Sequence, residues 1–356
     1  MSELLELYGD PLILSVGGLF IGGLFGFFAQ RSRFCLRAAV VEFWHRKFGE
    51  KLSVWLLAFS SAVILVQIMV LSGFLDKGSA RQISATGSIS GALVGGVLFG
   101  IGMILTRGCA SRLLVLSANG NLRALLSGLI FAVTAQASLA GVLLPVRTEI
   151  SSWWVIEGGP ERDLLASLQL SPIAGLIFGF IWAAAALFFV WRSPTRSRWM
   201  WIGGIGTGAM VAAAWGFSQW IAKHSFEAVQ IQGLTFSGPS AEWLMRVLSH
   251  PSPEIGFEFG MLPGVFLGSL IGALLGRDFK LEGFNDGYSM RRYIAGAILM
   301  GFGSMLAGGC AVGAGVTGGA IFALTAWVSL FGMWLGAGLA DRLIDTAPVT
   351  PSFRAP

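Results

Sequence analysis

The strongest constraint in this sequence is a series of long apolar runs separated by short charged segments. A helix needs about 20 apolar residues to cross the hydrocarbon core of a membrane. The chain offers about nine such runs, at approximately 12–30, 52–73, 88–106, 122–144, 172–192, 199–220, 258–276, 292–308 and 317–338. Charged residues make up only 12% of the chain, roughly half their share in a soluble domain. The sequence therefore predicts an all-α polytopic membrane protein, with residues 1–356 forming a single transmembrane domain.

The distribution of basic residues predicts the orientation of these spans. With the N-terminus placed outside, the inward segments hold 18 of the 24 Lys and Arg residues. These segments are 31–51, 107–123, 192–199, 277–293 and 339–356. Because Lys and Arg concentrate in cytoplasmic loops, we expect an outside N-terminus and a cytoplasmic C-terminus. The net charge of +5 then reflects contact with the lipid bilayer, and no nucleic-acid partner is expected.

Glycine dominates the pattern inside the spans. Many of the 50 Gly residues stand four apart, a spacing that lets helix backbones approach closely in lipid. Two glycine-rich stretches also match each other: GGVLFGIGMILTRGCA at 95–110 and GAILMGFGSMLAGGCA at 296–311. The first lies on the third span and the second on the eighth, so they run in opposite directions across the membrane. This predicts an inverted-topology internal repeat with approximate halves 1–171 and 172–356, which favours a transporter or channel.

The three cysteines each stand beside a span end or break. They are Cys35, Cys109 and Cys310, and Gly108 and the pair Gly308 and Gly309 precede the last two. We expect the helix to break there and a short helix to begin at the Cys, with its free N–H groups facing a buried anion path. Two alternatives remain: each Cys is a small core residue, or Cys109 and Cys310 form a disulfide. No metal site is expected, because none of the three His is near a Cys in sequence.

Four arginines flank the first two cysteines: Arg33 and Arg37 near Cys35, and Arg107 and Arg112 near Cys109. They serve either as cytoplasmic anchors or as groups that draw a small anion toward the pore. Cys310 has no charged neighbour in the sequence, and a neutral thiol there can donate a weak hydrogen bond to an anion. The sequence holds no phosphate-binding Gly-x-x-x-x-Gly-Lys-Ser/Thr loop and no visible catalytic Ser/His/Asp set. We therefore expect a protein that is not an enzyme.

These cysteine motifs carry a resemblance to a known family. Phe34-Cys35, Arg107-Gly108-Cys109 and Gly308-Gly309-Cys310 resemble the motifs of the YeeE/YedE family of sulfur-compound transport proteins, over nearly the whole chain. Arg107 is a departure, because the second half has Gly at this position. The resemblance implies a bacterial inner-membrane protein that passes thiosulfate along three thiols. It also implies a TusA-like cytoplasmic sulfur carrier as partner, and no cofactor.

Two other functions stay open at this stage. One is transport of a different sulfur or selenium species. The other is a membrane thiol–disulfide redox protein that uses Cys109 and Cys310 as its redox pair. Three free thiols in the isolated protein favour transport, whereas a disulfide that cycles with an electron donor favours the redox protein.

Overall fold

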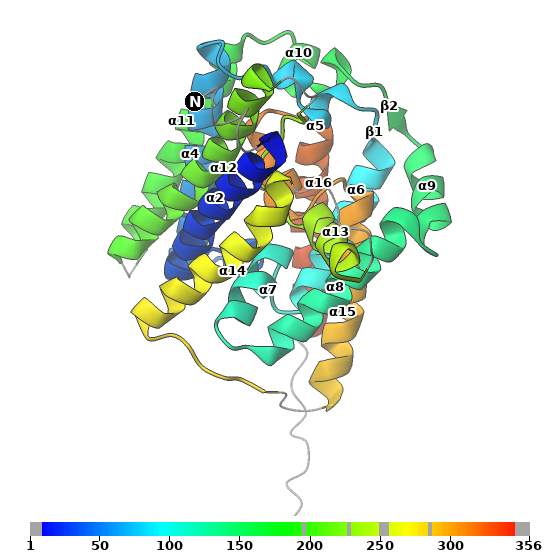
Figure 1. The fold of residues 1–356 in the computed structure, drawn as a ribbon. Helices are drawn as coiled ribbons and strands as arrows, with labels where there is room; N and C mark the ends of the chain where they lie inside the picture. The colour runs from blue at the N-terminus through cyan, green and yellow to red at the C-terminus, as the bar shows by residue number, and fades with distance from the viewer. Residues whose placement is uncertain (1–8, 194–196, 226–228, 249–255, 284–286, 346–356) are drawn as a thin grey trace, which may run out of the picture.

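The computed structural model describes residues 9–193, 197–225, 229–248, 256–283 and 287–345, which are almost entirely helical (Figure 1). The long helices are α2 (Asp10–Ser32), α4 (Glu50–Leu71), α6 (Ile89–Leu105), α8 (Leu122–Ala140), α11 (Pro172–Arg192), α12 (Arg198–His224), α14 (Phe257–Gly276), α15 (Gly287–Leu306) and α16 (Leu324–Ala340). The shorter elements are α3 (Leu36–Trp44), η1 (Lys77–Ser79), α5 (Arg81–Ser84), β1 (Gly87–Ser88), α7 (Ala110–Ala118), α9 (Leu144–Ser152), β2 (Val155–Ile156), η2 (Pro160–Arg162), α10 (Leu164–Ser167), α13 (Ser237–Leu248), η3 (Ala311–Gly318) and η4 (Asp341–Asp345).

The predicted spans correspond to the long helices in chain order. Eight segments of the described chain are long and apolar enough to cross a membrane, by length and composition. The ninth predicted span corresponds to α16, which has 17 residues and begins at Leu324 instead of near residue 317. It begins later because the π-helix η3 and the two helical residues after it belong to the break after α15, and the chain turns at 321–323, where Phe322 is left-handed (φ 60°). The prediction of an all-α polytopic membrane protein is confirmed.

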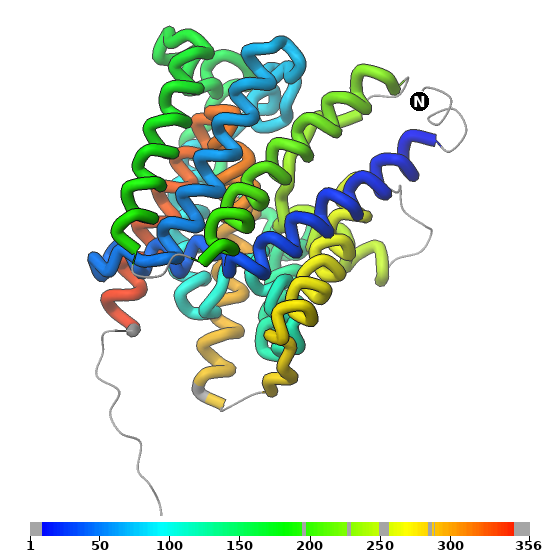
Figure 2. Tube along the Cα trace, turned by 90° about the vertical axis from the view of Figure 1, so that its left-hand side faces the viewer, coloured from blue at the N-terminus to red at the C-terminus, as the bar shows by residue number. Residues whose placement is uncertain are grey.

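The long helices pack in a small number of pairs. Helix α2 packs against α12 and α14, and α4 packs against α11 and α12. Helix α6 packs against α15 and α16, and α15 also packs against α8. Figure 2 shows α2 in blue and α14 in yellow running side by side, both tilted relative to α4 and α11. The three cysteines, which stand at breaks after α2, α6 and α15, are buried within this bundle.

Glycine makes these pairings close. A Cβ atom added at Gly260 would lie 1.8 Å from the carbonyl oxygen of Ser15, and one at Gly268 would lie 1.8 Å from that of Gly23. Between α6 and α15, a Cβ at Gly102 would lie 2.6 Å from the Gly296 oxygen. No side chain fits at such separations, so the backbones of α2 and α14 are in direct contact. The prediction of close packing through small residues is confirmed at these crossings.

The connection between α9 and α11 is fixed to the bundle by a buried arginine. Arg162 donates hydrogen bonds to the carbonyl oxygen of Ala85 and, at 2.8 Å, to the Thr325 hydroxyl at the start of α16. The adjacent Asp163 forms an ion pair with Lys77. Strands β1 and β2 pair in antiparallel fashion beside these contacts. The segment thus covers one end of α16 as an ordered part of the fold.

Candidate functional site

The three cysteines occupy the same kind of turn. Each follows a helix that ends in a residue with left-handed backbone, and each is the residue immediately before a new short helix. The left-handed residues are Arg33 (φ 55°), Arg107 (φ 58°) and Gly308 (φ 75°), the cysteines two positions later are Cys35, Cys109 and Cys310, and the new helices are α3, α7 and η3. The prediction that a short helix begins at the Cys of each Gly-Cys pair is confirmed for Cys109 and Cys310, and Cys35 shows the same arrangement.

The backbone reversal lies one residue before each Gly-Cys pair. Arg107 and Gly308 carry the positive φ, whereas Gly108 and Gly309 do not. Gly309 is required for a different reason, because a Cβ there would lie 2.8 Å from the Ala314 nitrogen. Arg107 adopts the same conformation as Gly308, so its departure from glycine leaves the turn unchanged. A left-handed residue other than glycine costs about 1–2 kcal/mol, which the surrounding fold must offset.

Each thiol faces the first turn of the helix that follows it. The Gly313 N–H donates to the Cys310 sulfur at 3.5 Å. The backbone groups three residues ahead, those of Ala38 and Arg112, act electrostatically on the Cys35 and Cys109 sulfurs, but neither sulfur accepts a hydrogen bond in its helix cap. The first N–H groups of a helix have no partner within the helix and carry a partial positive charge. The arrangement therefore presents thiols and N–H groups together, a combination suited to a small anion.

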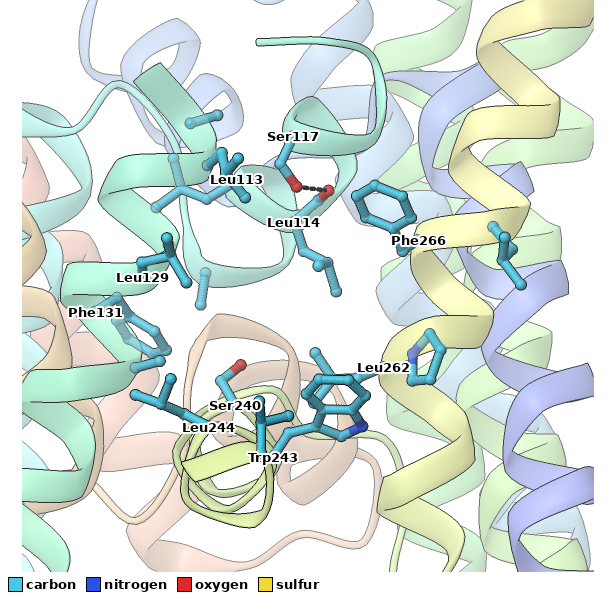
Figure 3. A pocket seen from close by; sticks show the side chains of 18 residues that line it. Leu113, Leu114, Ser117, Leu129, Phe131, Ser240, Trp243, Leu244, Leu262 and Phe266 are labelled. Atoms are coloured by element: carbon cyan, nitrogen blue, oxygen red, sulfur yellow. Dashed lines mark hydrogen bonds between the residues drawn. The ribbon is translucent and has the colours of Figure 1, made fainter. Parts of the chain in front are cut away.

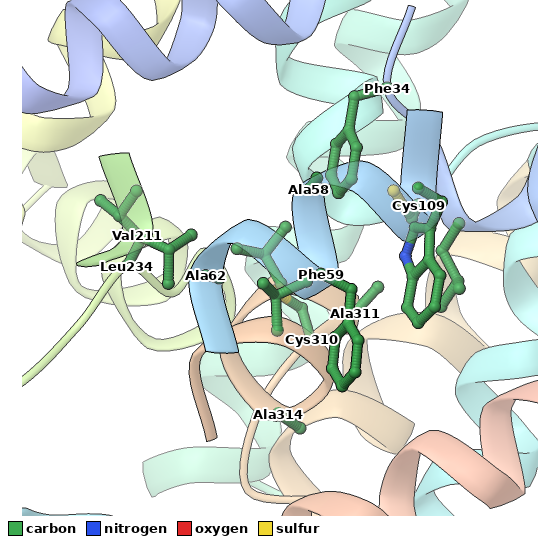
Figure 4. Packing of buried hydrophobic residues seen from close by; sticks show 14 of the residues in the cluster. Phe34, Ala58, Phe59, Ala62, Cys109, Val211, Leu234, Cys310, Ala311 and Ala314 are labelled. Carbon is green, nitrogen blue, oxygen red and sulfur yellow. The ribbon is translucent and has the colours of Figure 1, made fainter. Parts of the chain in front are cut away.

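The structure brings two of the thiols close together and keeps the third apart. The Cys35 and Cys109 thiols are close enough to act on each other electrostatically, and the Ser111 hydroxyl lies 3.5 Å from the Cys109 sulfur. Cys310 occupies a separate place in the same buried cluster (Figure 4). All three cysteines are free and buried. The pairing of Cys109 with Cys310 considered from the sequence is therefore replaced by proximity of Cys109 to Cys35.

The four candidate arginines separate into two groups. Arg37 and Arg112 act electrostatically on the Cys35 thiol, and Arg112 also donates to the Gln30 side-chain oxygen at 3.4 Å. Arg33 is 63% exposed and lies 3.9 Å from Asp278. Arg107 is also exposed. The structure thus places Arg37 and Arg112 at the paired thiols, and leaves Arg33 and Arg107 at the surface turns.

Three phenylalanines lie between the paired thiols and Cys310. The Phe25 ring is 6.4 Å from that of Phe34, which precedes Cys35, and 5.5 Å from that of Phe236. The backbone of Phe236 contacts the Cys310 thiol. All three rings are buried. This cluster was not predicted from the sequence, although Phe34 and Phe236 both stand close before a short helix, α3 and α13.

Other features of the described chain do not form a site for a metal or an anion in this region. No group of three or more His, Cys, Asp or Glu residues in the described part of the chain is placed to hold a metal ion. An apolar cavity of about 540 Å³ lies between α7, α8, α13 and α14 (Figure 3). Its lining residues, such as Leu113, Leu244 and Phe266, include no charged side chain. The cysteine turns are therefore the best candidate site for a small anion.

The fold and these turns define a multi-pass α-helical membrane protein with a buried thiol-containing site. The chain belongs to the sulphur transport family (YeeE/YedE), which matches it over residues 31–339. It is similar to the thiosulfate transporter TsuA of Escherichia coli (strain K12), at 25% identity over 95% of this chain and 96% of the relative. It is also similar to the thiosulfate transporter TsuA of Spirochaeta thermophila, at 27% identity over 91% of this chain and 98% of the relative.

Proposed function

We propose that this protein takes up thiosulfate, or a closely related small sulfur oxyanion, along a path lined by Cys35, Cys109 and Cys310. The observation that carries the proposal is the repeated turn: three free, buried thiols each stand at the start of a short helix. The names of the two relatives identify thiosulfate as their substrate. In this proposal the protein is a transporter and catalyses no chemical step.

The proposed path uses weak donors in succession. At Cys310 the anion would meet a thiol and the backbone N–H groups around it, and the groups acting on that thiol carry no charge. At the second site it would meet the Cys35 and Cys109 thiols, with the Arg37 and Arg112 guanidinium groups nearby. Because conduction requires each site to release the ion as well as bind it, neutral thiols suit this role better than a charged cage.

The proximity of Cys35 and Cys109 keeps a second candidate function in view. Two adjacent thiols can form a disulfide, so a membrane thiol–disulfide redox protein remains the alternative from a different class. Transport of another sulfur or selenium species is the alternative within transport. Reversible oxidation of the pair coupled to an electron donor, with no anion uptake, would favour the redox protein.

The proposal includes the cellular setting. We place the protein in the bacterial inner membrane with its N-terminus outside and its C-terminus in the cytoplasm, on the strength of the Lys and Arg distribution. Cysteine labelling at positions 45 and 160 tests this, since the two positions should react from opposite sides. The family resemblance adds a TusA-like sulfur carrier as cytoplasmic partner. Binding of such a purified carrier to inverted membrane vesicles, but not to right-side-out vesicles, is the matching test.

The proposal also includes an inverted-topology repeat, with halves inside 1–171 and 172–356. The packing supports it if α2, α4, α6 and α8 correspond to α12, α14, α15 and α16. Under this correspondence the repeat symmetry relates the packed pair α2–α14 to the pair α12–α4, and the pair α6–α16 to the pair α15–α8. All four pairs are in contact. Helix α11 then connects the two halves. A two-fold axis in the membrane plane should relate the halves in an experimental structure.

Uptake measurement tests the function directly. The chain is expressed in a bacterial strain that lacks other thiosulfate and sulfate uptake systems, with thiosulfate as the sole sulfur source. We expect growth and accumulation of radiolabelled thiosulfate with the natural chain. A variant with all three Cys replaced by Ala, inserted at the same level, should support neither. Equal growth with both chains would contradict the thiol path, and no growth with either would contradict thiosulfate as substrate.

A further inference from the structure

A polar cavity of about 560 Å³ lies at the end of the molecule where α2 and α14 begin. The charged residues that line it come from four elements: Asp10 of α2, Arg81 of α5, Glu242 and Arg246 of α13, and Glu258 of α14. None of these residues belongs to the cysteine turns. In the orientation proposed above, this cavity opens to the outside and is the first part of the protein that an arriving anion meets.

The segment 229–236, which has no regular secondary structure, runs from the cavity to Cys310. Ser218 and Gln232 line the cavity, and the Ser218 hydroxyl donates to the Gln232 carbonyl oxygen at 2.8 Å. Two residues further on, the Leu234 carbonyl oxygen accepts a hydrogen bond of 2.6 Å from Thr317 of η3. The next contact, from the backbone of Phe236, is to the Cys310 thiol itself. One continuous stretch of the chain thus runs from the cavity to Cys310, the first proposed thiol site.

Two carboxyl groups, those of Glu242 and Glu258, line this cavity together with Arg81 and Arg246. Glu258 is half-buried, and the charge of Glu242 acts on it. Two unprotonated carboxylates close together repel each other, whereas a proton on one of them removes the repulsion and allows a hydrogen bond between them. Arg81 and Arg246 also act on Glu258, and Asp10 accepts a hydrogen bond from Ser225.

We propose that Glu242 and Glu258 form a proton-binding site in this outer cavity, and that a shared proton there is required for an anion to be admitted to the Cys310 site. The proton comes from the water outside and binds to a carboxylate oxygen, and no covalent bond other than O–H is made or broken. When this proton is bound, the cavity carries one negative charge less, and Arg81 and Arg246 attract the anion. When the proton is lost, two neighbouring carboxylates repel the anion. The effect of this proton on uptake rests on the proposed function, that is, on thiosulfate transport by this protein.

The transport test compares uptake at different external pH values. With the natural chain, uptake of thiosulfate should fall as the external pH rises, by about tenfold for each pH unit above the midpoint of the titration. Glu258→Gln and Glu242→Gln each remove one charge permanently. We expect both variants to keep high uptake at alkaline pH and to lose most of the pH dependence. Glu149→Gln is the matched control: Glu149 lies on α9 outside this cavity, and its variant should keep the natural pH profile.

A second measurement does not depend on the substrate. Infrared spectra of the purified protein should show the C=O band of a protonated carboxyl group at neutral pH. This band should disappear in Glu258→Gln and in Glu242→Gln and persist in Glu149→Gln. A natural chain with no such band, or glutamine variants with the natural pH profile of uptake, would overturn the proton site. If the band behaves as expected but no variant takes up thiosulfate at any pH, the proton site stands and the proposed substrate fails.

Discussion

Replacing Cys310 with alanine tests the thiol path at its least complicated point. Cys310 is fully buried, and the groups that act on its thiol are uncharged backbone groups. The substitution removes one sulfur atom and leaves a void of about that size, which costs about 1 kcal/mol of folding stability. The protein should therefore still insert and fold. The change also removes the only side-chain donor at this turn, leaving the backbone N–H groups of η3 to bind the anion alone.

The size of the transport defect follows from the lost hydrogen bond. A hydrogen bond to a charged group contributes about 1.5–3 kcal/mol, and each 1.36 kcal/mol changes a rate by about tenfold. We expect uptake of radiolabelled thiosulfate to fall about 10- to 150-fold in Cys310→Ala. Cys310→Ser should give an intermediate rate, because a hydroxyl also donates but holds its own hydration more tightly.

Ser138→Ala is the control for the loss of a buried polar atom elsewhere. Ser138 is fully buried on α8 and donates to the Thr134 carbonyl oxygen at 2.7 Å, away from the cysteine turns. This variant should transport at the natural rate. Full uptake by Cys310→Ala at normal expression would refute the reasoning and identify Cys310 as an ordinary core residue.

Three further predictions follow from the turns. Mild oxidation should join Cys35 to Cys109, as detected by mass spectrometry of the peptides, because these thiols are close together; a disulfide to the third cysteine would contradict the arrangement. Arg112→Gln should lower uptake by about tenfold or more, because it removes a positive charge near the thiol pair. Arg107→Gln should have a small effect, because Arg107 is exposed. Equal effects of the two substitutions would contradict the division of the arginines into a group at the thiols and a group at the surface. Gly308→Ala should lower the free energy of unfolding of the detergent-purified protein by about 1–2 kcal/mol, because φ there is 75° and left-handed backbone is unfavourable for alanine. An unchanged free energy of unfolding would contradict this prediction.

The sequence predicted the spans well, because long apolar runs and glycine spacing are local signals. It also predicted a helix start at the Cys of each Gly-Cys pair. The ninth span was placed too early because residues 317–323 are apolar, and no local signal marks the turn at 321–323, where Phe322 is left-handed (φ 60°). The sequence did not indicate which residue of each break is left-handed. Arg107 shows why, since an arginine there holds the conformation that glycine holds at Gly308.

The partners of the cysteines were beyond prediction, because they depend on how distant helices meet. Nothing in the sequence indicates that Cys109 lies near Cys35 instead of Cys310, since the choice is made by the packing of α7 near the end of α2. The four arginines have similar sequence surroundings, and only the fold separates the half-buried Arg112 from the exposed Arg107. Gln30 was not considered at all, because a single polar residue near a helix end is common and carries no pattern.

The direct contact of the α2 and α14 backbones has a consequence for motion. Where a Cβ at Gly260 or Gly268 would overlap a facing carbonyl oxygen, one helix cannot slide or swing past the other without breaking the contact along its length. We expect this pair to move as one stiff body throughout the transport cycle. Any motion during transport should then take place between this pair and the rest of the bundle, and not within the pair. Spin labels on α2 and α14 should therefore report an unchanged separation with and without thiosulfate.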